Sequence, residues 1–153
     1  MNEIDAIEIR KIKNEEMNEC LNLVWRTFLE FEAPDYTQEG IDEFKKSIYD
    51  IDWIKQRKFI GAFEKNKLIG MIAIKNSNHI ALFFVDGKYH RRGIGRKLYQ
   101  YTVKQNNTGY FTVNSSPYAH EVYKHLGFVD TDIRQSVNGL IFYPMRNDKV
   151  NYN

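Results

Sequence analysis

A glycine-rich turn between an apolar run and a helical pattern constrains the fold of this chain most strongly. The run HIALFFV, residues 79–85, is apolar on both faces and is typical of a central strand. It leads through VDGKYHRRGIG into a helical pattern over residues 93–105, and GYFTV, residues 109–113, predicts a further strand. A strand–helix–strand unit closes by a right-handed crossover, so we expect these two strands to lie parallel in one sheet.

The segments before this unit predict two helices and an antiparallel meander. Apolar residues recur at helical spacing over residues 14–32 and again over residues 38–48, and Pro34 separates the two helices. KFIGAF and LIGMIAIK, residues 58–63 and 68–75, are separated by polar turns and are typical of strands. With residues 79–85 they form a meander.

The C-terminal segments predict one more helix and a hairpin. SSPYAHEVYKHLGF, residues 115–128, has a serine cap, a proline at the first helical position and a glycine stop. VDTDIRQSV and GLIFYPM then predict strands joined around Asn138 and Gly139. We expect a single α+β domain over residues 1–153, with a mixed, mostly antiparallel sheet of about six to seven strands flanked by helices.

Composition excludes several classes of protein. The 153 residues are 42% hydrophobic and 27% charged, as in globular proteins rather than disordered chains. The net charge of +2 is too small to indicate a nucleic-acid surface, and no apolar run approaches the ~18 residues of a membrane span. The N-terminus lacks the apolar core of a secretory signal, so we expect a cytoplasmic protein without nucleic-acid or membrane partners.

Thiol and metal chemistry are not indicated. The single cysteine, Cys20, excludes an internal disulfide and a multi-thiol zinc site, and it lies in an apolar helical stripe that indicates a buried core thiol. The histidines lack the ligand spacing of a metal site. We therefore expect no metal.

The turn after residues 79–85 has the chemistry of an anion site. A glycine turn that opens a helix directs backbone N–H groups and the positive end of the helix dipole to one point. Gly93 and Gly95 allow a phosphate close to the backbone, and Arg91, Arg92 and Arg96 add positive charge. The turn matches neither GxGxxG nor a P-loop. The alternative is a tight strand-to-helix turn with solvated arginines.

Three segments together resemble a known family. VDGKYHRRGIGRKLY, residues 85–99, resembles motif A of the GCN5-related N-acetyltransferase (GNAT) superfamily, whose loop binds the diphosphate of acetyl-CoA. Residues 116–128 resemble the family's motif B, and GLIFYPMRND resembles its final strand. The resemblance covers most of the chain from Phe59 onward and departs from the family pattern at His90, where glutamine or arginine is preferred.

The resemblance implies acetyl-CoA as cosubstrate, in a cleft where the central parallel strands splay apart near Val85 and Val113. The main chain at Phe84 and Val85 would bind the pantetheine arm, the loop amides would bind the diphosphate, and Asn114 would hold a cofactor amide. The cofactor-binding residues implied in this way are Phe84, Val85, His90, Arg91, Arg92, Gly93, Ile94, Gly95, Arg96 and Asn114.

By the same resemblance, Tyr123 has the position of the family's general acid in A-x-x-x-Y-x-x-x-G-F. A phenol with a pKa near ~10 stays protonated at neutral pH and can donate a proton to a departing thiolate. The alternative is a core tyrosine on an amphipathic helix.

The proton acceptor has several candidates. His79 stands where the histone-acetylating relatives carry a carboxylate, and an imidazole is suited to removing a proton near neutral pH. The alternative for His79 is a histidine in the turn after NSN. Glu30, Glu32 and Tyr36, in the acidic and aromatic segment FLEFEAPDY, would bind a cationic amine, and its acids are further candidates for the base. The alternative there is a polar connection between helices.

These features predict an N-acetyltransferase that moves acetyl from acetyl-CoA directly to a primary amine of a small molecule or peptide, within a ternary complex. One alternative is a non-catalytic acyl-CoA-binding regulatory module. A nucleic-acid binder is disfavoured because Phe83 and Phe84 would point to opposite faces of one strand. A homodimer through the aromatic strand GLIFYPM is possible.

Overall fold

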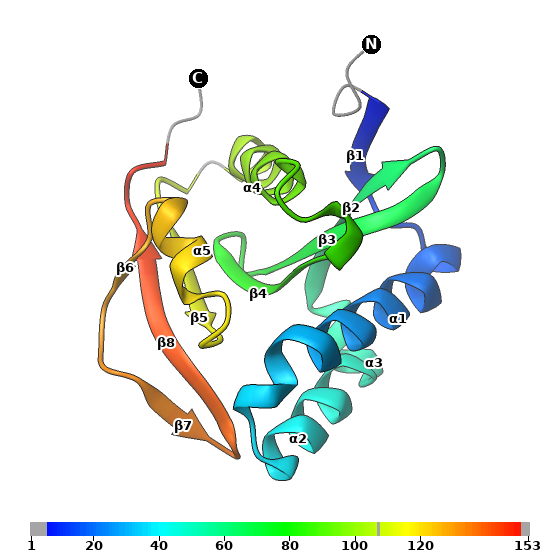
Figure 1. The fold of residues 1–153 in the computed structure, drawn as a ribbon. Helices are drawn as coiled ribbons and strands as arrows, with labels where there is room; N and C mark the ends of the chain where they lie inside the picture. Colours follow the sequence, from blue (N-terminus) through cyan, green and yellow to red (C-terminus); the bar gives the residue numbers. More distant parts are fainter. Residues whose placement is uncertain (1–5, 107, 151–153) are drawn as a thin grey trace.

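The computed structural model describes residues 6–106 and 108–150, so the ends of the predicted domain, residues 1–5 and 151–153, lie outside the described residues. The strands are β1 (Ile7–Lys11), β2 (Arg57–Glu64), β3 (Lys67–Lys75), β4 (His79–Val85), β5 (Phe111–Ser115), β6 (Val129–Asp130), β7 (Gln135–Val137) and β8 (Leu140–Asn147) (Figure 1). The α-helices are α1 (Met17–Thr27), α2 (Gln38–Ile48), α3 (Ile51–Lys55), α4 (Ile94–Gln105) and α5 (His120–His125).

The strands form a mixed sheet in the order β1-β2-β3-β4-β5-β8-β6, and β7 pairs with β8 outside this path. The β4–β5 pair is parallel, and the other pairs of the described strands are antiparallel. The predicted α+β fold is confirmed. The sheet has eight strands rather than six to seven, because β1 was not predicted and the strand expected after Phe128 divides into β6 and β7.

The splaying of the central strands follows from two irregularities. A register shift opposite Ala73 and Ile74 leaves Ala81 as an extra residue in β4, and such a bulge bends the strand that carries it. β4 pairs with β5 only at His79 and Ile80, although β4 continues to Val85. The predicted splayed pair is therefore present, and Figure 1 shows β4 and β5 diverging from their paired end.

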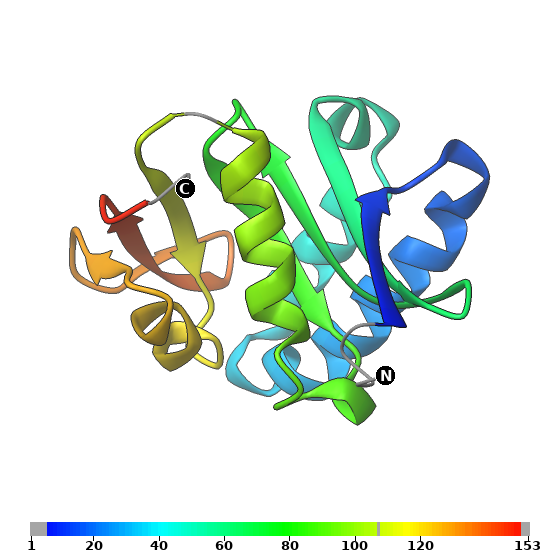
Figure 2. The same cartoon turned by 90° about the horizontal axis from the view of Figure 1, so that it is seen from above.

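Helices cover both faces of the sheet and define two cores (Figure 2). On the side of α1 and α2, Phe28 and Val24 pack against Phe84 and Leu82. On the side of α4, the partly buried Phe83 packs against a second cluster of buried residues. Phe83 and Phe84 thus point to opposite faces, as predicted. Among the described helices, none combines the length and apolar composition needed to cross a membrane.

The end of the first helix differs from a regular α-helix. α1 continues as a π-helix over Phe28–Glu32, and a 3-10 turn follows over Ala33–Asp35, where Pro34 interrupts the helix as predicted. A π-helix inserts an extra residue into a turn, is rare, and occurs frequently at functional sites. Here it rotates the last residue, Glu32, relative to a continued α-helix.

The hairpin between β7 and β8 docks on the start of α2. Asn138 and Gly139 have φ values of 53° and 80°, which confirms a left-handed two-residue turn. Gly40, in the first turn of α2, lies so close to the Gly139 carbonyl that a Cβ at residue 40 would clash with it. The side chain of Thr37 caps α2 by accepting a hydrogen bond from the Gly40 N–H at 3.4 Å. The contact holds the hairpin turn against the first turn of α2.

Candidate active site

The loop after β4 is anchored at its start by the buried carboxylate of Asp86. This carboxylate accepts hydrogen bonds from the Lys88 N–H at 3.0 Å and from the Arg26 guanidinium at 3.1 Å. Burial alone would raise the pKa of Asp86, but these two partners lower it below its usual range. The charged form is thus stabilised, and the loop is tied to α1.

A second anchor directs the main chain of Val85. The Asp86 N–H donates to Ile69 of β3 at 2.8 Å, and alternate residues of a strand direct their peptide groups to the same neighbour. The N–H and C=O of Val85 therefore point away from β3, toward the splayed gap, whereas those of Phe84 point to β3. His90 donates from Nε2 to the Val85 carbonyl at 2.7 Å, so it orders the loop beside the gap.

The start of α4 provides a group of unpaired amides. Gly93 caps the helix in a left-handed conformation with φ of 79°, which glycine adopts at little cost. The Lys97 N–H donates to the Gly93 carbonyl at 3.0 Å as the first turn closes. The N–H groups of Ile94, Gly95 and Arg96 precede this bond and have no intrahelical partner, which makes the helix start a suitable anion site.

These amides open into a cleft of about 930 Å³, here called the α4 cleft, between the end of β4, the loop 89–96 and α5. Eight of the ten predicted cofactor-binding residues line it. Arg91 and Arg96 give its loop side positive charge. Arg92 is exposed and lies outside the lining, with its guanidinium 5.4 Å from the centre of the Tyr89 ring.

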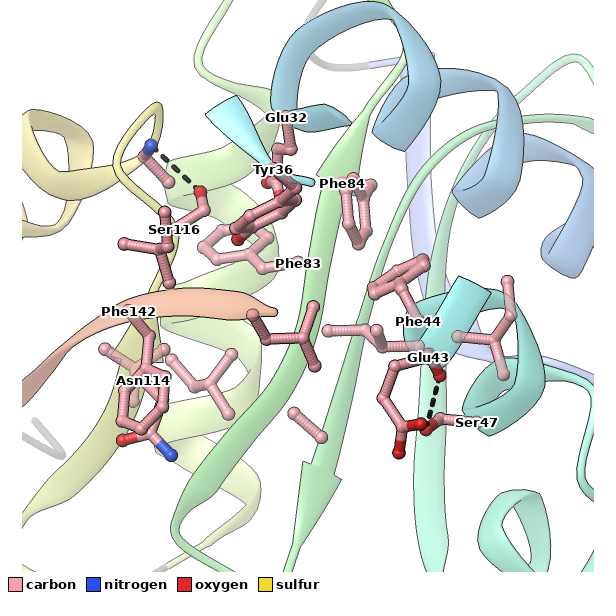
Figure 3. Close-up of a pocket in the computed structure, with 18 of the residues that line it drawn as sticks. Glu32, Tyr36, Glu43, Phe44, Ser47, Phe83, Phe84, Asn114, Ser116 and Phe142 are labelled. Atoms are coloured by element: carbon pink, nitrogen blue, oxygen red, sulfur yellow. Dashed lines mark hydrogen bonds between the residues drawn. The ribbon is translucent and has the colours of Figure 1, made fainter. Parts of the chain in front are cut away.

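A second space, here called the α2 cavity, has a volume of about 370 Å³ and lies between α2, β4, β5 and β8 (Figure 3). Its walls include the aromatic side chains of Tyr36, Phe44 and Phe142. Asn114, predicted to bind the cofactor, lines this cavity and not the α4 cleft. Of the other predicted cofactor residues, Phe84 alone also lines this cavity, because it lies in the wall between the two spaces.

The α2 cavity and the α4 cleft meet at a shared wall. Five residues line both spaces: Glu32, Phe83, Phe84, Ala119 and Tyr123. Two of them, Glu32 and Tyr123, carry a group that exchanges protons. The junction therefore places an acid–base pair between two spaces of different lining, one with arginines and one with aromatic walls.

Tyr123 is held in the junction by aromatic packing. It is 5% exposed, and its ring lies 6.0 Å from that of Phe83 and 5.4 Å from that of Phe128, both edge to face. Burial, and then the charge of Glu32, raise the pKa of Tyr123 well above its ordinary value. The hydroxyl is therefore protonated at neutral pH and is positioned to donate a proton.

Glu32, unlike Tyr123, has a pKa close to neutral pH. Burial raises the pKa of its carboxyl to about 7, a hydrogen bond with Ser116 lowers it in part, and the charge of Asp35 raises it further. A carboxyl that titrates near neutral pH can both accept and release a proton. Tyr36 lies beside Glu32 in Figure 3, and burial followed by the Glu32 charge raises the pKa of Tyr36.

Two predicted residues lie outside the junction. His79 is at the other end of β4 from Val85, roughly 20 Å away along the strand, and its Nδ1 is 2.8 Å from the Thr112 hydroxyl. Burial, and then the charges of neighbouring basic residues, lower the pKa of His79. Glu30 is exposed and lines neither space. The structure thus brings Glu32 to the junction with Tyr36 beside it, and leaves His79 and Glu30 away from it.

Three further residues that line the two spaces were not predicted as site residues. Glu43 and Ser116 line the α2 cavity. Phe31 lies at the rim of the α4 cleft, with its ring centre 4.8 Å from that of His90 and 5.2 Å from that of Tyr118. Helical spacing predicted an apolar face for Phe31, but the π-helix that orients this segment has no recognisable spacing. Within residues 6–106 and 108–150, no group of three or more His, Cys, Asp or Glu side chains could hold a metal ion.

Solved structures resemble this fold over most of its length. A GCN5-related N-acetyltransferase from Rhodopseudomonas palustris superposes with a TM-score of 0.79 at 20% identity, covering 92% of this chain and 94% of that one. The PaiA N-acetyltransferase from Thermoplasma acidophilum, solved with coenzyme A, has a TM-score of 0.69 at 19% identity and covers 92% and 98%. An aminoglycoside 6'-N-acetyltransferase complexed with coenzyme A has a TM-score of 0.62 at 11% identity and covers 92% and 96%.

Sequence comparisons add a family assignment. A search among curated proteins finds no match. The family model of the acetyltransferase (GNAT) domain matches residues 32–149, which include the loop 89–96, β5, α5 and β8. The match covers well over half of the chain and agrees with the fold of the similar structures. This protein belongs to the GNAT family of acetyltransferases.

Proposed function

We propose that this protein transfers an acetyl group from acetyl-CoA directly to a primary amine of a small molecule or peptide. The observation that carries the proposal is the junction of the α2 cavity and the α4 cleft at Glu32 and Tyr123. Two substrates, one in each space, would meet there. Holding both reactants together lowers the entropic part of the barrier to transfer.

The α4 cleft is the proposed site of acetyl-CoA. Amides at the start of α4, with Arg91 and Arg96, would bind the diphosphate, since hydrogen bonds to charged groups contribute roughly 1.5 to 3 kcal/mol each. The peptide groups of Val85 would pair with the pantetheine arm in the splayed gap. Two similar structures were solved with coenzyme A, which supports this use of the cleft.

The proposed chemistry uses one base and one acid. The amine reacts in its neutral form: its nitrogen bonds to the thioester carbonyl carbon, and Glu32, in its ionised form, accepts the proton that the nitrogen loses as this bond forms. The Val85 N–H stabilises the negative charge that develops on the carbonyl oxygen. As the carbon–sulfur bond breaks, Tyr123 donates its proton to the sulfur, which leaves as a thiol. Exchange with solvent returns Glu32 and Tyr123 to their starting states.

The test is a thiol-release assay with acetyl-CoA and a panel of primary amines, with the product identified by mass. Transfer predicts one thiol and one acetylated amine per turnover, and release without amine should be far slower. Acetyl-CoA binding without acetylation of any amine in the panel would instead favour a non-catalytic acyl-CoA-binding module. The homodimer and the cytoplasmic location stay predictions.

A further inference from the structure

The charges that line the α2 cavity all have one sign. Glu32 and Glu43 are the only charged side chains among the described residues of its lining, and both are acidic. Elsewhere the walls are aromatic, aliphatic or neutral polar. An acceptor that fills this space therefore meets negative charge at two points and positive charge at none.

The second carboxylate has no evident structural role. Glu43 is half-buried on α2. The Ser47 hydroxyl donates a hydrogen bond to the backbone carbonyl of Glu43 at 3.0 Å and not to its carboxylate. The ion pairs found in the described part of the chain do not include Glu43. A partly desolvated carboxylate without a cationic partner is unfavourable, so a ligand with a positive charge would relieve this cost.

The two carboxylates lie apart, with aromatic rings between them. In Figure 3, Glu32 lies near the junction, Glu43 lies at the other end of the α2 cavity, and Phe84 and Phe44 stand between them. The Phe44 and Phe84 rings are 6.1 Å apart, edge to face, and form a continuous apolar wall. Such a wall suits methylene groups, and the ring faces also attract a cation.

We propose that the acceptor carries two positive charges: a reacting amine at Glu32 and a second cationic group that pairs with Glu43 across an apolar spacer. The reacting amine at Glu32 rests on the proposed function, whereas the second cationic group is argued from Glu43 and the lining of the cavity. Glu43 thereby selects the acceptor without taking part in the chemistry.

Binding tests the proposal without turnover. Diaminobutane and diaminohexane, and the matched butylamine and hexylamine, would be titrated by calorimetry into protein saturated with coenzyme A. We expect at least one diamine to bind about tenfold or more tightly than its monoamine, the factor that one charge-assisted contact supplies. Glu43→Gln should remove that preference and leave monoamine affinity unchanged. Glu39→Gln, an exposed change on the same helix outside the cavity, should retain it.

Thiol release with the same amines, and with acetyl-CoA in place of coenzyme A, separates the two proposals. Diamine binding that depends on Glu43 without thiol release would support the dicationic acceptor and overturn the transferase. Equal affinity for diamines and monoamines in the native protein would overturn the dicationic acceptor while leaving the transferase intact. An equal loss for both ligands in Glu43→Gln would also overturn it, because Glu43 would then only shape the cavity.

Discussion

Replacing Glu32 by glutamine should lower activity and raise stability at the same time. The amide keeps the shape of the side chain but cannot accept the proton of the amine. A positioned general base contributes typically 10²–10⁴-fold, so kcat should fall by about that factor near pH 8. In the native protein the same base should make activity rise with pH through about pH 7, where the Glu32 pKa lies.

The effect on stability follows from the difference between the pKa of Glu32 in the folded protein and its pKa in the unfolded chain. The carboxyl has an ordinary pKa of 4.5 and a folded pKa of about 7. Between these values the folded protein keeps a proton that the unfolded chain has lost, so stability falls as pH rises through this window. At ~1.36 kcal/mol per pKa unit the cost above pH 7 is about 3 kcal/mol, less what partial exposure to solvent recovers.

The assay is chemical denaturation of both proteins at pH 4 and pH 8. Glu32→Gln should be more stable than the native protein by about 2 to 3 kcal/mol at pH 8 and nearly equal to it at pH 4. Glu30→Gln, an exposed change in the same segment, should alter neither stability nor kcat. A Glu32→Gln protein that is less stable at pH 8, or one that keeps its kcat, would refute the reasoning.

Three further predictions concern the junction and its surroundings. Tyr123→Phe should lower kcat by roughly 10²–10⁴ with acetyl-CoA affinity unchanged in calorimetry; an equal loss of affinity would contradict its role as acid. Gly40→Ala should push the β7–β8 turn off α2 and raise KM for the amine without changing acetyl-CoA affinity, whereas an unchanged KM would show that the turn does not shape the cavity. Cys20 is fully buried. Burial, and to a smaller extent the charge of Glu19, raise the pKa of its thiol to about 12. Cys20→Ala should therefore keep its turnover, and acetyl-CoA alone should leave no acetyl mass on the protein; a stable acetyl adduct would contradict direct transfer.

Local patterns predicted the elements that carry strong periodicity or clear punctuation. The meander of β2, β3 and β4, the helix α4 and the final hairpin all follow such patterns. β1 and α3 are five residues each, too short for a period to stand out, although the alternation of Ile7 and Ile9 in β1 was visible. The sequence therefore predicted the sheet except for β1 at one edge and the division of the strand after Phe128 into β6 and β7.

Some residues of the site could be predicted from local sequence, and others could not. The loop 89–96 is contiguous in sequence, so its glycines and arginines predicted the α4 cleft directly. The choice of base depends on distance through space: His79 and Val85 share a strand but lie at its opposite ends. Glu32 enters the junction because α1 ends as a π-helix, and Glu43 lines the α2 cavity because of the way α2 packs beside the sheet. Both depend on tertiary packing.

Calorimetric titration of acetyl-CoA tests the central claim most directly, with Gly95→Glu as the disrupted variant. Gly95 lines the α4 cleft, and a Cβ there meets Phe83 at an ordinary 3.5 Å, so the variant should fold. Gln100→Glu, an exposed residue of the same helix outside the cleft, provides the matched control. We predict micromolar binding to the native protein and to Gln100→Glu, and none to Gly95→Glu. Absent binding to the native protein, or equal binding to all three, would contradict a diphosphate site at the start of α4.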